Sequence, residues 1–143
     1  MKVESGKLKI TRQMTMHSGI KVCSCRKEEI YTAICREAGL GTYTSYIRGT
    51  RCTTEIAFFR EMSASLQFPY YFGENWPALD ECLCDLEWLR FEKLLIIIDD
   101  FGRLFSSQAE LQSVLQKRVV KYMQVMVEYW ETQNKTVEIW LNN

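Results

Sequence analysis

The fold is decided by an apolar run in the second half of the chain, Leu94-Leu95-Ile96-Ile97-Ile98. A run without polar residues is typical of a β-strand that is covered on both faces. The neighbouring segments alternate between strand and helix patterns, and strands separated by helices pair in parallel through right-handed crossovers. We therefore expect an α/β protein in which helices cover a small, mainly parallel β-sheet.

Hydrophobic periodicity predicts the other elements on either side of this run. Thr53 is the expected N-cap of the helix over residues 53–67. The inward stripe of this helix is expected to contain Ile56, Phe59, Met62 and Leu66. The predicted strands cover residues 7–16, 20–25, 41–49, 93–99 and 136–141, and the predicted helices cover residues 26–39, 53–67, 75–89 and 107–131, with a short helical turn at residues 101–105.

The chain has 143 residues, 47% of them hydrophobic, which is enough for one domain with a sizeable core. Residues 1–41, a predicted ββα extension, are too few to fold alone, so we expect them to pack on residues 42–143. No apolar run approaches the roughly 20 residues of a membrane span, and the first residues lack the apolar core of a signal peptide. We expect a single soluble, cytoplasmic domain over residues 1–143, without a membrane partner.

Charge is distributed unevenly although the formal net charge is zero. Residues 1–60 carry 11 basic and 5 acidic side chains, whereas residues 61–89 carry six carboxylates and neither lysine nor arginine. A molecule with such a charge asymmetry steers a charged partner onto one patch. An acidic, aromatic-rich segment disfavours direct contact with nucleic acid and favours a basic protein partner. An uneven scatter of charges without functional meaning is the alternative.

The predicted helix over residues 75–89 has two unlike faces at about 100° per residue. Its apolar side contains Leu79, Cys82, Leu83 and Leu86. Its other side, either a partner-binding surface or an ordinary solvated face, contains Pro77, Asp80, Glu81, Cys84, Asp85 and Trp88. Asn75 is the expected N-cap, and Gly73 is expected to supply a positive φ in the preceding loop.

The barstar family, small bacterial proteins that inhibit ribonucleases related to barnase, has a signature that resembles residues 71–83, YFGENWPALDECL. The order of predicted elements from about residue 42 to 142 is also similar to that of the family. The resemblance implies an intracellular inhibitor that occludes a ribonuclease active site with an aromatic loop and an acidic helix face. By position, the implied partner-binding residues are Tyr71, Gly73, Asn75, Trp76, Pro77, Asp80 and Glu81.

Three of these positions depart from barstar itself. Glu81 falls where barstar places its main phosphate-mimicking aspartate, and its side chain is one methylene longer. Pro77 stands where barstar has an aspartate, and Asp80 where barstar has a tryptophan. The departures leave the target open. We expect a basic bacterial ribonuclease or ribonuclease toxin, and the alternative is a barstar-like interaction module with a partner that is not a nuclease.

An enzyme is the competing hypothesis, because Asp99 and Asp100 follow a buried strand, where α/β folds place active sites. However, the phosphate-binding pattern G-x-x-x-x-G-K-[ST] does not occur, and His17 is the only histidine available for acid–base chemistry. Asp100 is instead expected to cap the following helical turn. The six cysteines lack the usual zinc-ligand spacing. We therefore expect no catalytic residue, no cofactor and no metal site.

Overall fold

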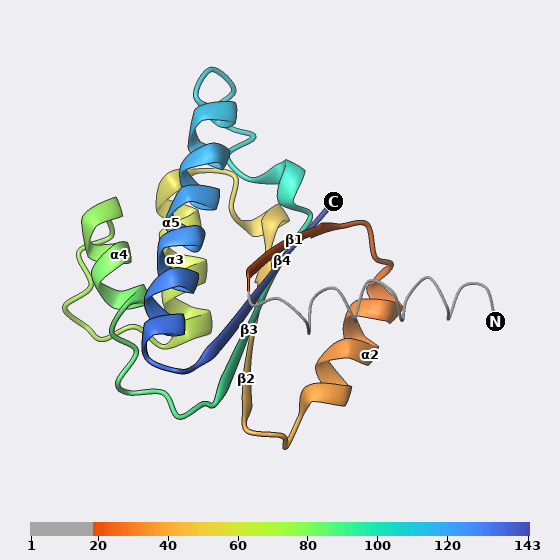
Figure 1. Cartoon of the computed structure of the whole chain (residues 1–143). Helices are drawn as coiled ribbons and strands as arrows, with labels where there is room; N and C mark the ends of the chain where they lie inside the picture. The colour runs from red at the N-terminus through yellow and green to blue at the C-terminus, as the bar shows by residue number, and fades with distance from the viewer. Residues whose placement is uncertain (1–18) are drawn as a thin grey trace.

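The computed structural model in Figure 1 describes residues 19–143. Four strands alternate with four helices and two short 3-10 turns. In chain order the elements are β1 (Gly19–Cys23), α2 (Lys27–Glu37), β2 (Thr42–Arg48), η1 (Gly49–Arg51), α3 (Glu55–Leu66), α4 (Trp76–Leu83), β3 (Lys93–Asp99), η2 (Phe101–Arg103), α5 (Gln112–Thr132) and β4 (Thr136–Asn142).

The four strands form one sheet in the order β1-β4-β3-β2, and all three neighbouring pairs are parallel. The apolar run lies in β3, and Ile96 sits in register with Ser45 of β2 and Ile139 of β4. The side chains from Leu94 to Ile98 are at most 1% exposed, because β3 is an inner strand with helices over both of its faces. The predicted parallel sheet is thus confirmed.

The helices divide unequally between the two faces of the sheet. In Figure 1, α2 lies on one side of the strands, and α3, α4 and α5 lie on the other. On the α2 side, Ile30 and Ala33 pack against Leu95, Ile97 and Trp140. The alternate residues of β3 and β4 contribute to the larger core under the other three helices, so the layered α/β architecture is confirmed.

Residues 19–41 are joined to the sheet at both of its edges. β1 pairs with β4 over Gly19–Cys23, and α2 then crosses to β2 at the opposite edge. Lys93 of β3 forms ion pairs with Glu37 of α2 and with Glu138 of β4, at 3.0 and 2.9 Å. The strand predicted over residues 7–16 lies outside the described residues, so the single domain over 1–143 remains a prediction.

Two details of α3 differ from the sequence prediction. The N-cap is Thr54 rather than Thr53, because the Thr54 hydroxyl accepts the Ala57 N–H at 3.2 Å. Ile56 points outward and is 44% exposed, whereas Phe58 lies in the core with the remaining residues of the predicted stripe. The outward Ile56 therefore belongs to the surface of the molecule.

The long helix α5 begins at Gln112, later than the predicted residue 107. The preceding residues form turns that are fixed by glutamine side chains. Gln108 accepts the Glu55 N–H at 2.7 Å, and Gln112 donates to the carbonyls of Gly102 and Leu104 at 3.1 and 3.0 Å. Only the bond between Gln108 and Glu55 joins segments far apart in the sequence, and helical periodicity reports none of these contacts.

Candidate partner-binding surface

The start of α4 is fixed by its N-cap. The Asn75 side-chain oxygen accepts the Ala78 N–H at 2.9 Å, which confirms the predicted cap. The Asn75 amide nitrogen donates to the Gly73 carbonyl at 3.1 Å and so closes the loop onto the helix. Pro77 lies in the first turn, where a helix needs no N–H donor. The loop and the helix are therefore positioned as one unit.

The loop turns at Glu74 rather than at Gly73. Glu74 has a φ of 51°, and Gly73 is not in the positive-φ region, so the prediction for Gly73 is wrong. The Glu74 carboxylate accepts a hydrogen bond from Arg60 of α3 at 2.9 Å, which holds the residue in its left-handed conformation. Gly73 is needed for space instead, because a Cβ at this position would lie 3.0 Å from the Asn75 amide nitrogen.

Trp76 lies under this surface. Its side chain is only 8% exposed, and its indole N–H donates to Glu55 of α3 at 2.8 Å. The ring contacts Phe58 and Phe59, and the Arg118 guanidinium lies 5.5 Å from the ring centroid. Trp76 thus anchors the first turn of α4 to the core and presents little area to a partner.

The helix ends at Leu83, so the prediction that it reaches Leu89 is wrong. Leu86 adopts a φ of 46°, which a continuing helix does not allow. The Trp88 indole then donates to the Leu66 carbonyl at 2.9 Å, which fixes the path of the chain after the helix. The predicted apolar side is nevertheless buried throughout, with Leu79, Cys82, Leu83 and Leu86 between 0 and 5% exposed.

The six carboxylates of residues 61–89 fall into two groups. Two are paired across elements: Glu61 with Arg48 at 2.9 Å and Glu74 with Arg60 at 2.9 Å. The other four form no ion pair within residues 19–143, and they are Asp80, Glu81, Asp85 and Glu87. Except for the half-buried Asp80, these four are exposed. We call the loop over residues 70–75, the outward side of α4 and the following turn to residue 87 the loop–α4 surface.

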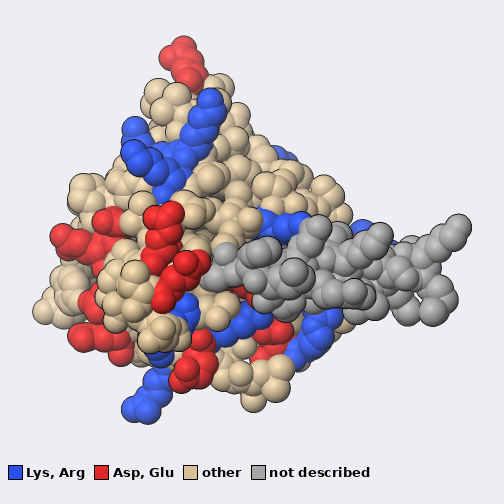
Figure 2. All heavy atoms as spheres, viewed as in Figure 1, with Lys and Arg blue, Asp and Glu red and all other residues tan. Residues whose placement is uncertain are grey.

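The loop and the unpaired acids lie close enough to affect one another. Partial burial, and then the negative charge of Asp85, raises the pKa of the Tyr71 hydroxyl. In Figure 2, carboxylates gather on the side of the molecule where Figure 1 places α4, and cationic side chains lie above them over the upper half of α5. The loop–α4 surface therefore combines exposed aromatic rings with concentrated negative charge.

The sequence-predicted residues occupy different depths of this surface. Tyr71, Gly73, Asn75, Pro77 and Glu81 are exposed, whereas Asp80 is half-buried and Trp76 is buried. The prediction omitted Tyr70, which is fully exposed and packs edge-on against Tyr71 with ring centroids 5.7 Å apart. The signal was present in the sequence, because Tyr70 and Tyr71 are adjacent aromatics between Phe68 and Phe72, the aromatics that pack on the core.

Comparison with protein families gives one match, to the family described as Barstar (barnase inhibitor), over residues 42–142. The match covers more than half of the chain and extends from the first residue of β2 to the end of β4. This chain belongs to the barstar family. The family consists of inhibitors rather than enzymes, and its members bind ribonucleases. No curated protein matches the chain.

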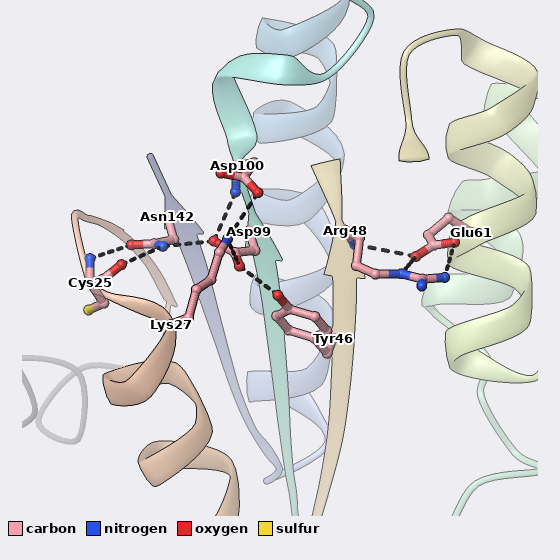
Figure 3. A network of polar contacts seen from close by, with 8 residues as sticks. All are labelled: Cys25, Lys27, Tyr46, Arg48, Glu61, Asp99, Asp100 and Asn142. Atoms are coloured by element: carbon pink, nitrogen blue, oxygen red, sulfur yellow. Dashed lines mark hydrogen bonds and ion pairs between the residues drawn. The ribbon is translucent and has the colours of Figure 1, made fainter. Parts of the chain in front are cut away.

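Residues 19–41 lie outside the region that matches the barstar family. Lys27 in this segment contacts a second group of acids, Asp99 and Asp100, as Figure 3 shows. Asp99, 1% exposed, accepts hydrogen bonds from Lys27 of α2, from Tyr46 at 2.6 Å and from Asn142 at 2.8 Å. Burial opposes the charge of Asp99, but these hydrogen bonds outweigh it and lower the pKa of the carboxyl group. Burial and the contact with Asp99 raise the pKa of Tyr46 to about 12.

The Asp99 site is therefore a satisfied structural network. Both carboxylate oxygens have donors, and Lys27 is held as a cation, because its hydrogen bond to Asp99 raises its pKa. Asp100 stands at the N-cap position of η2, as predicted, but its side chain makes no capping bond there and accepts from Lys27 at 3.0 Å instead.

The thiols and the carboxylates have no metal-binding arrangement in the described part of the chain. No disulfide joins cysteines there, and no group of three or more His, Cys, Asp or Glu side chains within residues 19–143 is placed to hold a metal ion. Burial raises the pKa of the Cys52 thiol to about 12, as expected for a thiol that serves as a small core side chain. Between residues 19 and 143, no helix combines the length and the apolar character needed to cross a membrane.

Proposed function

We propose that this barstar-family protein inhibits a basic bacterial ribonuclease by covering its active site with the loop–α4 surface. The observation that carries the proposal is the set of carboxylates on that surface that form no ion pair within residues 19–143. Side by side they repel one another, and a cationic active site would relieve that repulsion. In this role the protein is an antitoxin or immunity protein that acts in the bacterial cytoplasm against a ribonuclease toxin.

The proposed contacts divide by chemistry. Glu81, exposed at the middle of α4, enters among the cationic groups that otherwise bind RNA phosphates, with Asp80 beside it. Tyr70 and Tyr71 supply exposed aromatic area, and aromatic side chains are enriched among residues that dominate binding energy. Gly73, Asn75 and Pro77 form the compact edge between loop and helix. Trp76 supports these groups from the core.

The test is a titration of the full chain into RNA-cleavage assays of basic ribonucleases related to barnase, including any that is encoded beside its own gene. We expect cleavage to stop at one-to-one stoichiometry, and we expect the chain alone to leave RNA intact. The Glu81→Ala variant is expected to inhibit far less. The matched control is Glu110→Ala, which removes an exposed carboxylate that precedes α5, away from the loop–α4 surface.

Two results would contradict the proposal. Cleavage of RNA by the purified chain would assign it an enzymatic role. Tight binding to a partner protein without any loss of ribonuclease activity would instead favour a barstar-like interaction module whose target is not a nuclease.

A further inference from the structure

Within residues 19–143, no strand pairs with the outer side of β2, the strand at one edge of the sheet. β2 is the last strand in the order β1-β4-β3-β2, and its inner side pairs with β3 from Thr42 to Arg48. In a parallel ladder, the N–H and C=O groups of alternate residues point to the same neighbour. The Arg48 N–H points outward, because it donates to the Glu61 carboxylate at 3.3 Å. The backbone groups of Tyr46 and Thr44 therefore point outward as well.

Two open hollows share Glu61 of α3: the larger lies between β2 and α3, and the smaller continues along α3 toward the end of η1. One has a volume of about 490 Å³ and the other about 380 Å³. We call them together the β2–α3 groove. The larger hollow is lined by Tyr46, Arg48, Glu61, Ala64 and Ser65, and the smaller by Arg51, Thr54, Ile56, Ala57, Arg60 and Glu61.

The lining is cationic, with three arginines and one glutamate. Figure 3 shows Arg48 reaching from β2 to Glu61 of α3, with nitrogen–oxygen distances of 2.9 and 3.3 Å. Arg60 pairs with Glu74, outside the groove. Arg51 is exposed and forms no ion pair within residues 19–143. Arg51 therefore leaves a positive charge available to an incoming carboxylate.

We infer that the β2–α3 groove binds an extended acidic segment of another protein, which adds to β2 as a fifth strand. An added strand gains affinity from main-chain hydrogen bonds and specificity from pockets for alternate side chains. Here the outward N–H and C=O groups of Thr44 and Tyr46 pair with the segment, and its carboxylates meet Arg51. The small side chains of Ala57 and Ala64 leave room for the apolar residues of the segment, and the exposed Ile56 offers them an apolar contact.

Glu61 prepares the edge for this exchange. Its carboxylate accepts hydrogen bonds from the Arg48 N–H and the Arg48 guanidinium, so the Arg48 end of the edge is covered in the free protein. A carbonyl of the incoming strand can accept the hydrogen bond of the Arg48 N–H in place of Glu61. An acidic side chain of the strand can pair with the Arg48 guanidinium in the same way. The Arg48 side chain of this pair is 49% exposed, so an incoming carboxylate can reach the guanidinium from the solvent.

The charge of the lining identifies the occupant. A second copy that paired through its own β2 would bring two arginine-lined edges together, and like charges across an interface oppose association. An acidic segment instead faces three arginines and one glutamate, Glu61. The groove lies on α3 and β2 rather than on the exposed acids of α4, so the inference does not depend on ribonuclease inhibition.

The probe is a labelled peptide of about eight residues that alternates valine and glutamate, long enough to span one strand. The control peptide alternates valine and lysine. We expect the acidic peptide to bind the full chain, with the largest amide NMR shifts at Thr44, Tyr46 and Arg48. A version of the acidic peptide with N-methyl groups on alternate amides loses main-chain donors, and it is expected to bind about tenfold more weakly.

The variant that tests the charge is Arg51→Glu, which is expected to weaken binding of the acidic peptide about tenfold. Arg90→Glu is the matched control, because Arg90 is an exposed arginine before β3 that does not line the groove. Arg60 is left unchanged, since its replacement would also release Glu74. Equal binding of both peptides, amide shifts elsewhere, or an unchanged affinity of Arg51→Glu would overturn the inference. Dimerisation through β2 in sedimentation without peptide would overturn it in favour of a second copy.

Discussion

Two groups of neighbouring carboxylates within residues 19–143 differ in burial and in pairing. Asp99 is buried in the sheet and receives hydrogen bonds from three other side chains. Glu81 and Asp85 on the loop–α4 surface are exposed and form no ion pair within residues 19–143. An unpaired charge is tolerated at an exposed position but is very costly in the interior.

The difference separates a structural role from a binding role. Asp99 joins α2, β2, β3 and β4, so its contribution is to the folded state of this chain. Glu81 contributes nothing comparable to the fold, and its charge is available to a second molecule. The two groups thus predict opposite mutational signatures, one in stability and the other in affinity.

The sharpest test of the comparison is Asp99→Ala. We expect the free energy of unfolding to fall by about 3–5 kcal/mol, because breaking a buried charged network leaves its remaining partners unsatisfied. Tyr46 and Asn142 then lose their acceptor, whereas the ammonium of Lys27, whose side chain is 61% exposed, can return to water. Chemical denaturation measures the change. Asp100→Ala is the matched control, and we expect it to cost less than about 1 kcal/mol.

The comparison fails if the two aspartates behave alike. A loss below about 1 kcal/mol in Asp99→Ala would mean that the network is not required by the fold. The carboxyl end of β3, where Asp99 lies, would then have to be reconsidered as a functional site.

The second test is Glu81→Ala on the loop–α4 surface. We expect the variant to lose roughly 2–5 kcal/mol of binding free energy toward the target ribonuclease, because cationic groups are left buried and unpaired in the complex. Its thermal stability should be unchanged or slightly higher, since repulsion with Asp85 is relieved. Titration calorimetry and thermal unfolding of the same sample measure both quantities. A variant that unfolds but binds normally per folded molecule would make this surface structural.

The third test changes the solvent rather than the protein. If the loop–α4 surface steers a basic ribonuclease, its association rate should fall about tenfold between roughly 0.05 and 0.5 M salt, because screening shortens the range of the attraction. The dissociation rate should change much less. Stopped-flow mixing at several salt concentrations separates the two rates. An association rate that does not depend on salt would remove electrostatic steering from the proposal.

Much of the fold could be predicted because the signals for it are local. The apolar run of β3 and the periodicity of α2, α3 and α5 report burial directly. The end of α4 was not predicted, because helical periodicity does not report the positive φ of Leu86 or the bond from Trp88 to the distant Leu66 carbonyl that follows it. The link between Lys27 and Asp99 was equally hidden, since it forms only when α2 has crossed the sheet.

The partner-binding residues were implied by the resemblance to the barstar family and remain a prediction, whereas the acidic side of α4 was predicted from a local signal. The acids of α4 and the cap at Asn75 follow from spacing alone. The depth of Trp76 does not, because a tryptophan in the first turn of a helix suits either a core or an interface. Its contacts with Phe58 and Glu55 place it in the core. The β2–α3 groove was not predicted, because the position of β2 at the sheet edge depends on the strand order.

The smallest expected effect concerns Asn75, which has a structural role as the N-cap of α4 and a proposed role in binding the ribonuclease. Asn75→Ala removes the N-cap of α4 and should lower the free energy of unfolding by about 1 kcal/mol. Asn75→Gly should lower it by only about a few tenths of a kcal/mol, because glycine is itself accepted at N-caps. If the Asn75 side chain also contacts the ribonuclease, both variants should lose the same affinity despite their different stabilities. Affinities that follow stability instead would show that Asn75 acts only by holding α4 in place.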